Sequence, residues 1–306
     1  EQLIINGSIN VYGTLVLKNC QIYMNCTYDG ENGVFIFEGG NLTLYNTLIS
    51  AYNVSNAYLF KVHEGSSFYA EDSVVEYCGY EYNWPAYDHA GLWINADGVN
   101  LVNCTLRYNY VGVVAYNCSS LELNDCAFEE NHCGLYVRLC SSFSLDACTF
   151  ESNDHAASSY DCSSFSLENC HFLNNAWDGF GAGCCSNCTL RNCYFFNSTL
   201  SCFFFHQCSN FLLDDCTVEN CGLVGLFMSE CSNFTLVNCS FYHDGVWIDA
   251  YYDQWPTYSF EKVTVNGLPL YYAFDQSGLA ISGDYGQVIL AYCDSCEISN
   301  VPACIE

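Results

Sequence analysis

Apolar and polar residues alternate along most of the chain in short runs that are separated by a slip in phase. In residues 143–150 (FSLDACTF), Phe143 and Leu145 face one side and Ser144 the other, and the alternation resumes after a slip at Cys148. A period of two is typical of a β-strand with one buried face, and no stretch shows a helical period. We therefore predict short strands joined at corners and an all-β chain.

A sequence of ten residues recurs several times along the chain. SSFSLDACTF at residues 141–150 returns 22 residues later as SSFSLENCHF, and related runs continue at steps of 22 or 23 residues. In looser copies of the run, the position of this cysteine is occupied by Cys20, Thr47, Ser73 and Val263. Such constancy is the signature of a repeat fold. The regular copies align seven cysteines in a first column: Cys104, Cys126, Cys148, Cys170, Cys193, Cys216 and Cys239.

A second alternating arm follows in each copy, as in residues 134–140 (GLYVRLC). It ends at a second column, which we assign to Cys118, Cys140, Cys162, Cys184, Cys208 and Cys231. A third column lies five residues after the first, at Asn109, Asn131, Asn153 and Asn175. Two to three strands per turn predict a single right-handed parallel β-helix of about 11–12 coils of 22–23 residues, with cysteine and asparagine ladders inside.

We expect one domain over residues 1–306, with regular coils at 100–242 and looser coils at 1–99 and 243–306. Insertions near 79–91 and 243–257 interrupt the rhythm, and each carries a Trp-Pro pair among tyrosines and acidic residues. Such loops can stack on sugars, contact a neighbouring subunit, or pack over their own coil.

The composition allows a large core, because 51% of the residues are hydrophobic, and no apolar run reaches the length of a membrane span. Against 34 acidic residues stand only 6 Lys and Arg, a formal charge of −28. Binding of nucleic acid needs a basic surface and is excluded. Anionic lipids and polyanionic sugars are disfavoured as well. Divalent cations such as calcium are favoured at the acidic surface, and no other cofactor is predicted.

Several features favour a secreted protein. The chain begins at Glu1 without a Met, from which we expect a mature, processed form. Asn-x-Ser/Thr sequences are acceptors for glycans when they lie on the surface of a secreted protein. Ten occur, at Asn6, Asn25, Asn41, Asn53, Asn103, Asn117, Asn187, Asn197, Asn233 and Asn238. We expect an extracellular, cell-envelope or sheath location.

The ladder cysteines have two interpretations. Stacked Cα atoms about 4.8 Å apart suit a disulfide, but parallel Cβ vectors do not, so we favour buried, inert thiols. The cysteines outside the ladders are the better disulfide candidates: Cys26, Cys78, Cys133, Cys185, Cys188, Cys202, Cys221, Cys293, Cys296 and Cys304. A zinc site shared by the two C-x-x-C pairs is disfavoured by their separation. The seven histidines fall in no shared column, which disfavours a copper or zinc site.

The repeat resembles the pectin-lyase-like superfamily of β-helices over about residues 10–270. The Asn-Thr-Asp, His-Gly and Arg-Ile-Lys signatures of its polygalacturonase branch are absent. Arg107, Arg138 and Arg191 occupy different places in the repeat and predict no common cationic cleft. The adjacent Asp214 and Asp215 point to opposite faces, unlike a catalytic pair. We therefore predict a protein that is not an enzyme.

The acidic, cysteine-rich β-helix is similar to sheath or surface-layer proteins of methanogenic archaea. This resemblance implies a structural protein that self-assembles end to end. Open β-helix ends and disulfides would join its copies into a resistant sheath, surface layer or filament. Residues 3–17 and 287–304 are the expected contacts. The alternative is a carbohydrate-binding or carbohydrate-cleaving β-helix that uses its Trp-Pro loops. A periplasmic metal-handling protein is a third interpretation.

Overall fold

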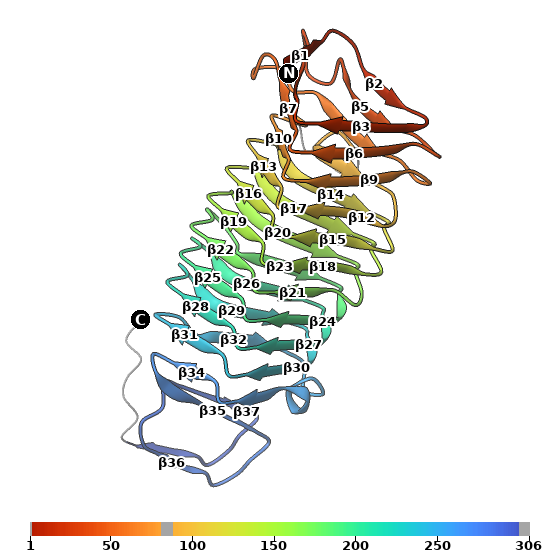
Figure 1. The fold of residues 1–306 in the computed structure, drawn as a ribbon. Helices are drawn as coiled ribbons and strands as arrows, with labels where there is room; N and C mark the ends of the chain where they lie inside the picture. The colour runs from red at the N-terminus through yellow and green to blue at the C-terminus, as the bar shows by residue number, and fades with distance from the viewer. Residues whose placement is uncertain (1, 81–87, 300–306) are drawn as a thin grey trace.

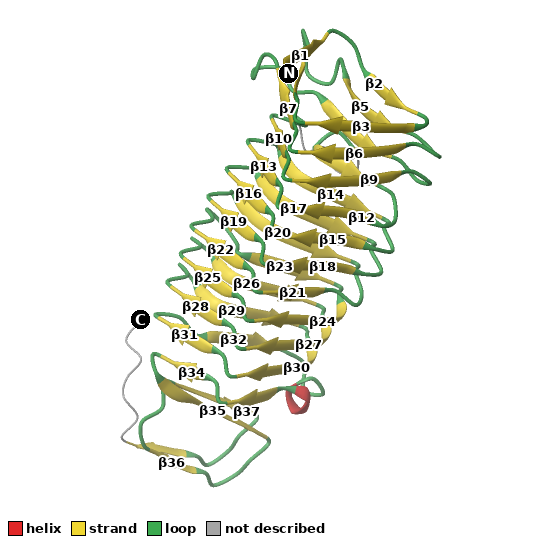
Figure 2. Cartoon of the chain, viewed as in Figure 1, coloured by secondary structure: helices red, strands yellow, loops and turns green. Residues whose placement is uncertain are grey.

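The computed structural model describes residues 2–80 and 88–299, and in them the chain winds through three strands per coil along one axis (Figure 1). Two of the three long sheets hold 11 strands each, which confirms the predicted parallel β-helix of about 11 coils. Among the described residues the only helix is the 3-10 turn η1 (Trp255–Thr257), which Figure 2 shows near one end of the molecule.

The strands form three long sheets and one short pair. Sheet A contains β1 (Gln2–Ile5), β4 (Gln21–Met24), β7 (Leu48–Ala51), β10 (Val74–Glu76), β13 (Thr105–Arg107), β16 (Ala127–Glu129), β19 (Thr149–Glu151), β22 (His171–Leu173), β25 (Tyr194–Phe196), β28 (Thr217–Glu219), β31 (Ser240–Tyr242), β34 (Thr264–Val265), β35 (Leu268–Phe274) and β37 (Gln287–Ala291). Sheet B contains β2 (Ile9–Val11), β5 (Gly33–Ile36), β8 (Leu59–Val62), β11 (Gly91–Ile94), β14 (Val111–Tyr116), β17 (Cys133–Arg138), β20 (His155–Tyr160), β23 (Phe180–Gly183), β26 (Ser201–His206), β29 (Val224–Ser229) and β32 (Val246–Asp249). Sheet C contains β3 (Thr14–Lys18), β6 (Asn41–Tyr45), β9 (Ser67–Glu71), β12 (Val99–Val102), β15 (Leu121–Asn124), β18 (Phe143–Asp146), β21 (Ser166–Glu168), β24 (Ser186–Arg191), β27 (Ser209–Asp214), β30 (Ser232–Val237) and β33 (Ser259–Glu261), and the short pair is β36 (Ala280–Ser282) with β38 (Glu297–Ser299).

Left-handed residues make the corners that the phase slip predicts. The residue before each cysteine of the first ladder has a positive φ, as at Asn103 (49°), Asp125 (53°) and Asn169 (55°). Asn and Asp tolerate this conformation better than most residues. They therefore recur at this corner, and one left-handed residue turns sheet C into sheet A in each coil.

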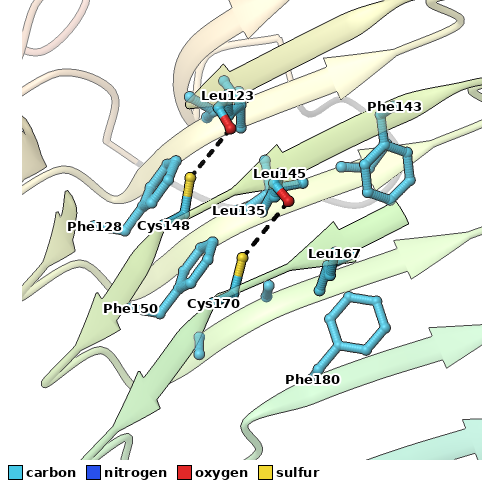
Figure 3. Packing of buried hydrophobic residues seen from close by; sticks show 14 of the residues in the cluster. Leu123, Phe128, Leu135, Phe143, Leu145, Cys148, Phe150, Leu167, Cys170 and Phe180 are labelled. Carbon is cyan, nitrogen blue, oxygen red and sulfur yellow. Dashed lines mark hydrogen bonds between the residues drawn. The ribbon is translucent and has the colours of Figure 1, made fainter. Parts of the chain in front are cut away.

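The core consists of stacked identical side chains. Phe128, Phe150, Phe172 and Phe195 lie in successive coils with ring centroids 4.5, 4.8 and 4.3 Å apart and nearly parallel planes. Figure 3 shows the ladder thiols beside these rings: Cys148 Sγ donates to the Leu123 carbonyl at 3.3 Å. The thiols therefore fill space and also satisfy carbonyls where the backbone bends.

The asparagine column is the predicted buried ladder. Asn153 Nδ2 donates to the Phe128 carbonyl at 2.9 Å, and its Oδ1 accepts from the backbone N–H of Asn131 at 3.0 Å. Asn175 repeats the contact one coil later, on the Phe150 carbonyl at 3.1 Å. Each amide thus satisfies backbone groups that the corner leaves without a strand partner.

The coil pattern changes near the C-terminal end. β34 and β35 pair antiparallel, and β35 then pairs with β37. Gln287 reaches the last strand of sheet B, where its Oε1 accepts from the Val246 N–H at 2.9 Å and its Nε2 donates to the Val246 carbonyl at 2.7 Å. The edge that we expected to be open at this end is therefore covered at Val246 by a side-chain amide.

The second Trp-Pro insertion packs over its own coil. Trp255 Nε1 donates to the Ala250 carbonyl at 3.1 Å, and the Tyr258 hydroxyl donates to the Cys231 carbonyl at 2.7 Å. Tyr251 and Tyr252 of the same insertion stay exposed. The first pair, Trp84 and Pro85, lies outside the described residues.

Candidate functional site

The structure corrects one position of the second cysteine ladder. Cys185, not Cys184, lies in the core, and its Sγ donates to the Gly183 carbonyl at 3.3 Å. Cys184 is exposed and has a φ of 53°, because it occupies the left-handed corner position. This coil is one residue longer than the one before it, and two adjacent cysteines left the register open in the sequence. The other predicted ladder cysteines are all buried: Cys104, Cys118, Cys126, Cys140, Cys148, Cys162, Cys170, Cys193, Cys208, Cys216, Cys231 and Cys239.

The cysteines outside the ladders lie in several environments. The structure joins Cys202 to Cys221 in a disulfide between adjacent coils. Cys293 and Cys296 are half-buried, and Cys304 lies outside the described residues. The other candidates carry buried free thiols, at Cys26, Cys78, Cys133 and Cys188 together with the ladder residue Cys185.

We expect the ladder thiols to resist alkylation in the native state. These thiols are buried, so the reagent does not reach them. Hydrogen bonds of the Cys148 thiol to Cys126 and Cys170, together with burial, also favour its protonated form and raise its pKa. Cys184 is accessible, and its pKa is raised by desolvation and by Asp161, so its labelling should accelerate as the pH rises. Mass spectrometry after iodoacetamide treatment, without and with denaturant, measures both. Rapid native labelling of Cys148 would show that the ladder is not closed.

The predicted acceptor asparagines lie mainly on exposed corners. Six have a positive φ: Asn103, Asn117, Asn187, Asn197, Asn233 and Asn238. Asn6 and Asn53 are also exposed, whereas Asn25 and Asn41 are half-buried. Several of their amides form hydrogen-bonded rows from coil to coil, such as Asn233 Nδ2 to Asn210 Oδ1 at 3.0 Å. Glycosylation of these residues stays a prediction.

Chemically active side chains gather on the outer face of sheet B, at the start of β17, β20 and β23. His132 Nδ1 lies 2.7 Å from Asp154 Oδ2, and the rings of His132 and His155 are 6.1 Å apart. His155 in turn interacts electrostatically with Asp178 of the next coil. His132 thus pairs with an aspartate one coil further on, and His155 has Asp178 at the corresponding place of the following coil.

A hollow of about 150 Å³ lies at these pairs, and we call it the His–Asp pocket. Its volume is below the roughly 300–1,000 Å³ of cavities that enclose a small molecule. It is therefore a shallow subsite on an open face, suited to one unit of a longer ligand. It is lined by His132, Cys133, Tyr136, His155, Ser158 and Tyr160, with Asp154 and Asp178 beside it.

Burial separates the protonation behaviour of these groups. Desolvation raises the pKa of Asp178, against the hydrogen bond from the Ser201 backbone. Desolvation also lowers the pKa of His155, while the charge of Asp178 acts in the opposite direction. Burial raises the pKa of Cys133 to about 12, which makes its thiol a lining group and no nucleophile. Asp178, whose pKa desolvation raises, and Asp154, which contacts His132, thus lie in different environments, as the two carboxyl groups of an acid–base pair do.

Aromatic side chains frame the pocket. The ring of Tyr110 lies 4.7 Å from that of His132, and the ring of Trp177 lies 4.6 Å from that of His155. Trp177 and Tyr160 are 51% and 43% exposed, so each presents a ring face or edge to solvent. Aromatic faces beside polar groups are suited to the apolar face of a sugar ring.

The sequence did not reveal this cluster, because its histidines align neither with one another nor with a cysteine column. His132 and Asp154 each follow a ladder asparagine directly, and His155 comes two residues after Asn153. Counting from the asparagine column therefore places them together. The arginines behave as expected, since Arg107 pairs with Glu76 at 2.8 Å and Arg191 with Asp214 at 3.1 Å, on other parts of the surface.

Neither metal ligation nor a membrane span is indicated by the described part of the chain. Within it, no group of three or more His, Cys, Asp or Glu side chains is arranged to hold a metal ion. Calcium at the acidic surface stays a prediction. Between residues 2 and 80 and between 88 and 299, no helix is long and apolar enough to cross a bilayer.

Comparison with known proteins identifies the fold. A family model described as a right handed beta helix region matches residues 4–139 and 133–300. No curated protein matches the sequence significantly. Among solved structures, the periplasmic alginate epimerase AlgG has a TM-score of 0.54 and 10% identity, covering 97% of this chain and 85% of its own. The A-module of an Azotobacter vinelandii mannuronan C-5 epimerase has a TM-score of 0.53 and 9% identity, covering 97% and 91%.

The tailspike protein 3 of bacteriophage CBA120 has a TM-score of 0.64 and 11% identity. The match covers this whole chain and 56% of the tailspike. At such identities the likeness shows the fold alone. It nevertheless corrects the prediction of a protein that is not an enzyme, because two of these three neighbours are named as epimerases and share the fold over nearly the whole chain. The missing polygalacturonase signatures therefore gave no ground to exclude activity.

Proposed function

The chain belongs to the right-handed β-helix family, and from that premise we propose that it binds a neutral polysaccharide on the outer face of sheet B and hydrolyses it at the His–Asp pocket. The observation that carries this proposal is the pair of carboxyl groups in different environments beside one aromatic-framed hollow. Asp178 has a raised pKa, and Asp154 is held by His132 at 2.7 Å. Glycoside hydrolysis uses such a pair as acid and base or nucleophile.

The roles follow from the environments. Asp178 would donate its proton to the glycosidic oxygen as the bond to the sugar breaks. Asp154, oriented by His132, would accept the proton of the attacking water, or would attack the sugar carbon itself. His155 interacts electrostatically with both carboxyl groups, and desolvation lowers its pKa, which favours the neutral imidazole. The products are a free hemiacetal and a free hydroxyl group, with one water consumed.

The charge of the chain supports a neutral substrate. Asp154 contacts His132 of the pocket lining, Asp178 acts electrostatically on His155, and the charge of Arg138, the basic side chain of β17, is paired with Asp161 at 3.5 Å. A uronate polymer would add negative charge to a surface that carries −28 overall. The proposal therefore differs from the substrate that the names of the neighbouring epimerases state. Those names include a periplasmic enzyme, which supports a location outside the cytoplasm as part of the proposal.

Loss of the acid group tests this function. We expect the protein to release reducing ends from at least one polymer in a panel of neutral glucans, mannans, galactans and xylans. Asp178→Asn should lower that rate by about 100-fold or more, because asparagine cannot donate the proton. Asp125→Asn, at an exposed corner of another sheet, is the matched control and should keep full activity. Unchanged activity in Asp178→Asn, or no release from any polymer, would contradict the proposal.

The pH dependence has a definite sign. Because Asp178 acts in its protonated form, activity should fall as the pH rises through its raised pKa. A raised pKa in the folded state also means that ionised Asp178 destabilises the fold above that pH. Asp178→Asn should therefore be at least as stable as the parent at pH 7 while being inactive. Thermal melts and rate profiles from pH 3 to 8 measure the two effects, and a melting temperature that falls in the variant would disagree.

Self-assembly is the second candidate, and an observation at the N-terminal coil favours it. Within residues 2–80 and 88–299, β1, β2 and β3 pair with a strand on one side only, and Leu3 and Ile4 are 44% and 46% exposed. Unpaired strand edges with exposed apolar side chains promote association. The amide of Gln287 covers Val246 at the other end, which weakens the head-to-tail version that we expected for a sheath. Negative-stain microscopy distinguishes filaments from single particles.

A further inference from the structure

A second aromatic group lies on the outer face of sheet B, away from the His–Asp pocket. Phe204, Phe227 and Trp247 stand on β26, β29 and β32 at equivalent positions of successive coils. Their ring centroids are 5.3 and 6.0 Å apart, and Phe204 and Trp247 are 40% and 62% exposed. Contiguous exposed aromatic side chains, unlike single ones, are typical of a binding surface. We call these three residues the aromatic platform.

The platform and the pocket share one column of the sheet. Ser158 of β20, which lines the pocket, pairs with Gly181 of β23, and Gly181 pairs with Phe204. Ser158 and Gly181 are the two small residues that separate the pocket from the platform along this column. Gly181 is buried, and a Cβ added there would meet no atom nearer than 3.7 Å, on Ser158 Oγ.

Additional open space adjoins the outer end of the platform. A hollow of about 440 Å³ is lined there by Trp247, Trp255, Leu223 and Ile289. Leu223 is 70% exposed, and no charged side chain lines this hollow. The column thus begins at a polar, titratable pocket and ends at an uncharged aromatic surface. This order matches a ligand that reacts at one place and is held by its uncharged rings at another.

We propose that the aromatic platform binds the distal units of a neutral, unbranched glycan that runs parallel to the β-helix axis and ends in the His–Asp pocket. This inference rests on the proposed function for the nature of the ligand. Coils repeat at about 4.8 Å, a rise similar to the length of one pyranose unit in an extended glycan. Successive sugar rings therefore meet successive aromatic rings, with their apolar faces on Phe204, Phe227 and Trp247.

A glycan fits this surface better than a protein partner. The platform is one residue wide, whereas specific protein interfaces bury about 800 Å² on each side. Polar side chains flank it, among them His206 and Ser229 at the ends of β26 and β29. A narrow aromatic row with polar flanks is suited to rings that have apolar faces and hydroxyl-bearing edges.

Binding is tested in the Asp178→Asn background, so that the ligand is not cleaved. The probes are hydroxyethyl cellulose and galactomannan, together with any polymer that the intact protein hydrolyses, in affinity electrophoresis. We expect Trp247→Ala and Phe204→Ala each to weaken binding about 3- to 10-fold, because each removes one stacking contact between an aromatic ring and a sugar ring. Tyr242→Ala is the control, because Tyr242 is 40% exposed, like Phe204, but lies on sheet A.

Gly181→Trp gives an independent measurement. The added indole would stand in the column between the pocket and the platform and should weaken binding of the polymer, while a disaccharide of the same sugar still reaches the pocket. Carboxymethyl cellulose has the backbone of hydroxyethyl cellulose with added negative charge, and it should bind more weakly. Equal binding by Trp247→Ala, Phe204→Ala and Tyr242→Ala, or no binding of any neutral polymer, would overturn the inference.

The two proposals can fail separately. Binding that depends on Trp247 without release of reducing ends would retain the platform and reject hydrolysis. Hydrolysis at the same rate by the parent, Trp247→Ala and Gly181→Trp, for chains of every length, would retain the pocket and reject the platform.

Discussion

Replacing Phe172 with alanine is expected to lower the free energy of unfolding by about 3–5 kcal/mol. Phe172 is fully buried, and its ring lies between those of Phe150 and Phe195, with centroids 4.8 and 4.3 Å away. The cavity would interrupt a stack in which each ring is nearly parallel to the next. The neighbouring coils could close it only by changing the strand spacing on which every other ladder depends.

Urea unfolding followed by circular dichroism measures this loss. Because each coil contacts mainly its neighbours, hydrogen exchange should also accelerate most in β19, β22 and β25 and least at the two ends. Phe204→Ala is the control, since its 40% exposed ring should cost about 0.5 kcal/mol or less. A loss below about 1 kcal/mol in Phe172→Ala would contradict the packing described for the core.

Replacing Asn153 with alanine should have an effect of similar size by a different mechanism. The change would leave the Asn131 N–H and the Phe128 carbonyl buried without partners, and each such group costs about 1–3 kcal/mol. It would also remove the contact of Asn153 Nδ2 with Asn175 Oδ1 at 3.2 Å. We therefore expect a loss of about 2–6 kcal/mol, although the substitution removes little apolar surface.

Two further variants separate hydrogen bonding from volume. Asn153→Asp keeps the volume and an acceptor for Asn131, but its second oxygen would face the Phe128 carbonyl and Asn175 Oδ1, so it should lose at least as much stability as the alanine variant at pH 7. Asn6→Ala removes an amide from an exposed hydrogen bond, with Asn25 Nδ2 at 2.8 Å, and should change stability by about 0.5 kcal/mol or less. If Asn153→Ala and Asn6→Ala proved equally stable, the buried ladder would have no structural role.

Much of the fold was predictable because the information that builds a coil is local and repeated. The alternation around Leu145 and Cys148 specifies the inward face of a strand, and the recurrence at 22 or 23 residues specifies that coils stack in register. Once one coil places Asn131 at a corner, parallel pairing places Asn153 at the same corner of the next. The left-handed corner is also recognisable in the sequence, because Asn or Asp, which tolerate a positive φ, precedes most cysteines of the first ladder.

The site depended on tertiary structure, for physical reasons that particular residues show. A one-residue lengthening of one coil decides whether Cys184 or Cys185 enters the core, and only the strand pairing around them resolves it. The site residues come from three coils: His132, Asp154, His155 and Asp178. Whether they lie together depends on the register between the strands of successive coils. The raised pKa of Asp178 and the lowered pKa of His155 arise from burial against atoms of other coils. The sequence alone determined the repeat, because period and register are properties of neighbouring residues, whereas only the folded chain decided the chemistry, because proximity and desolvation are properties of residues that are distant in sequence.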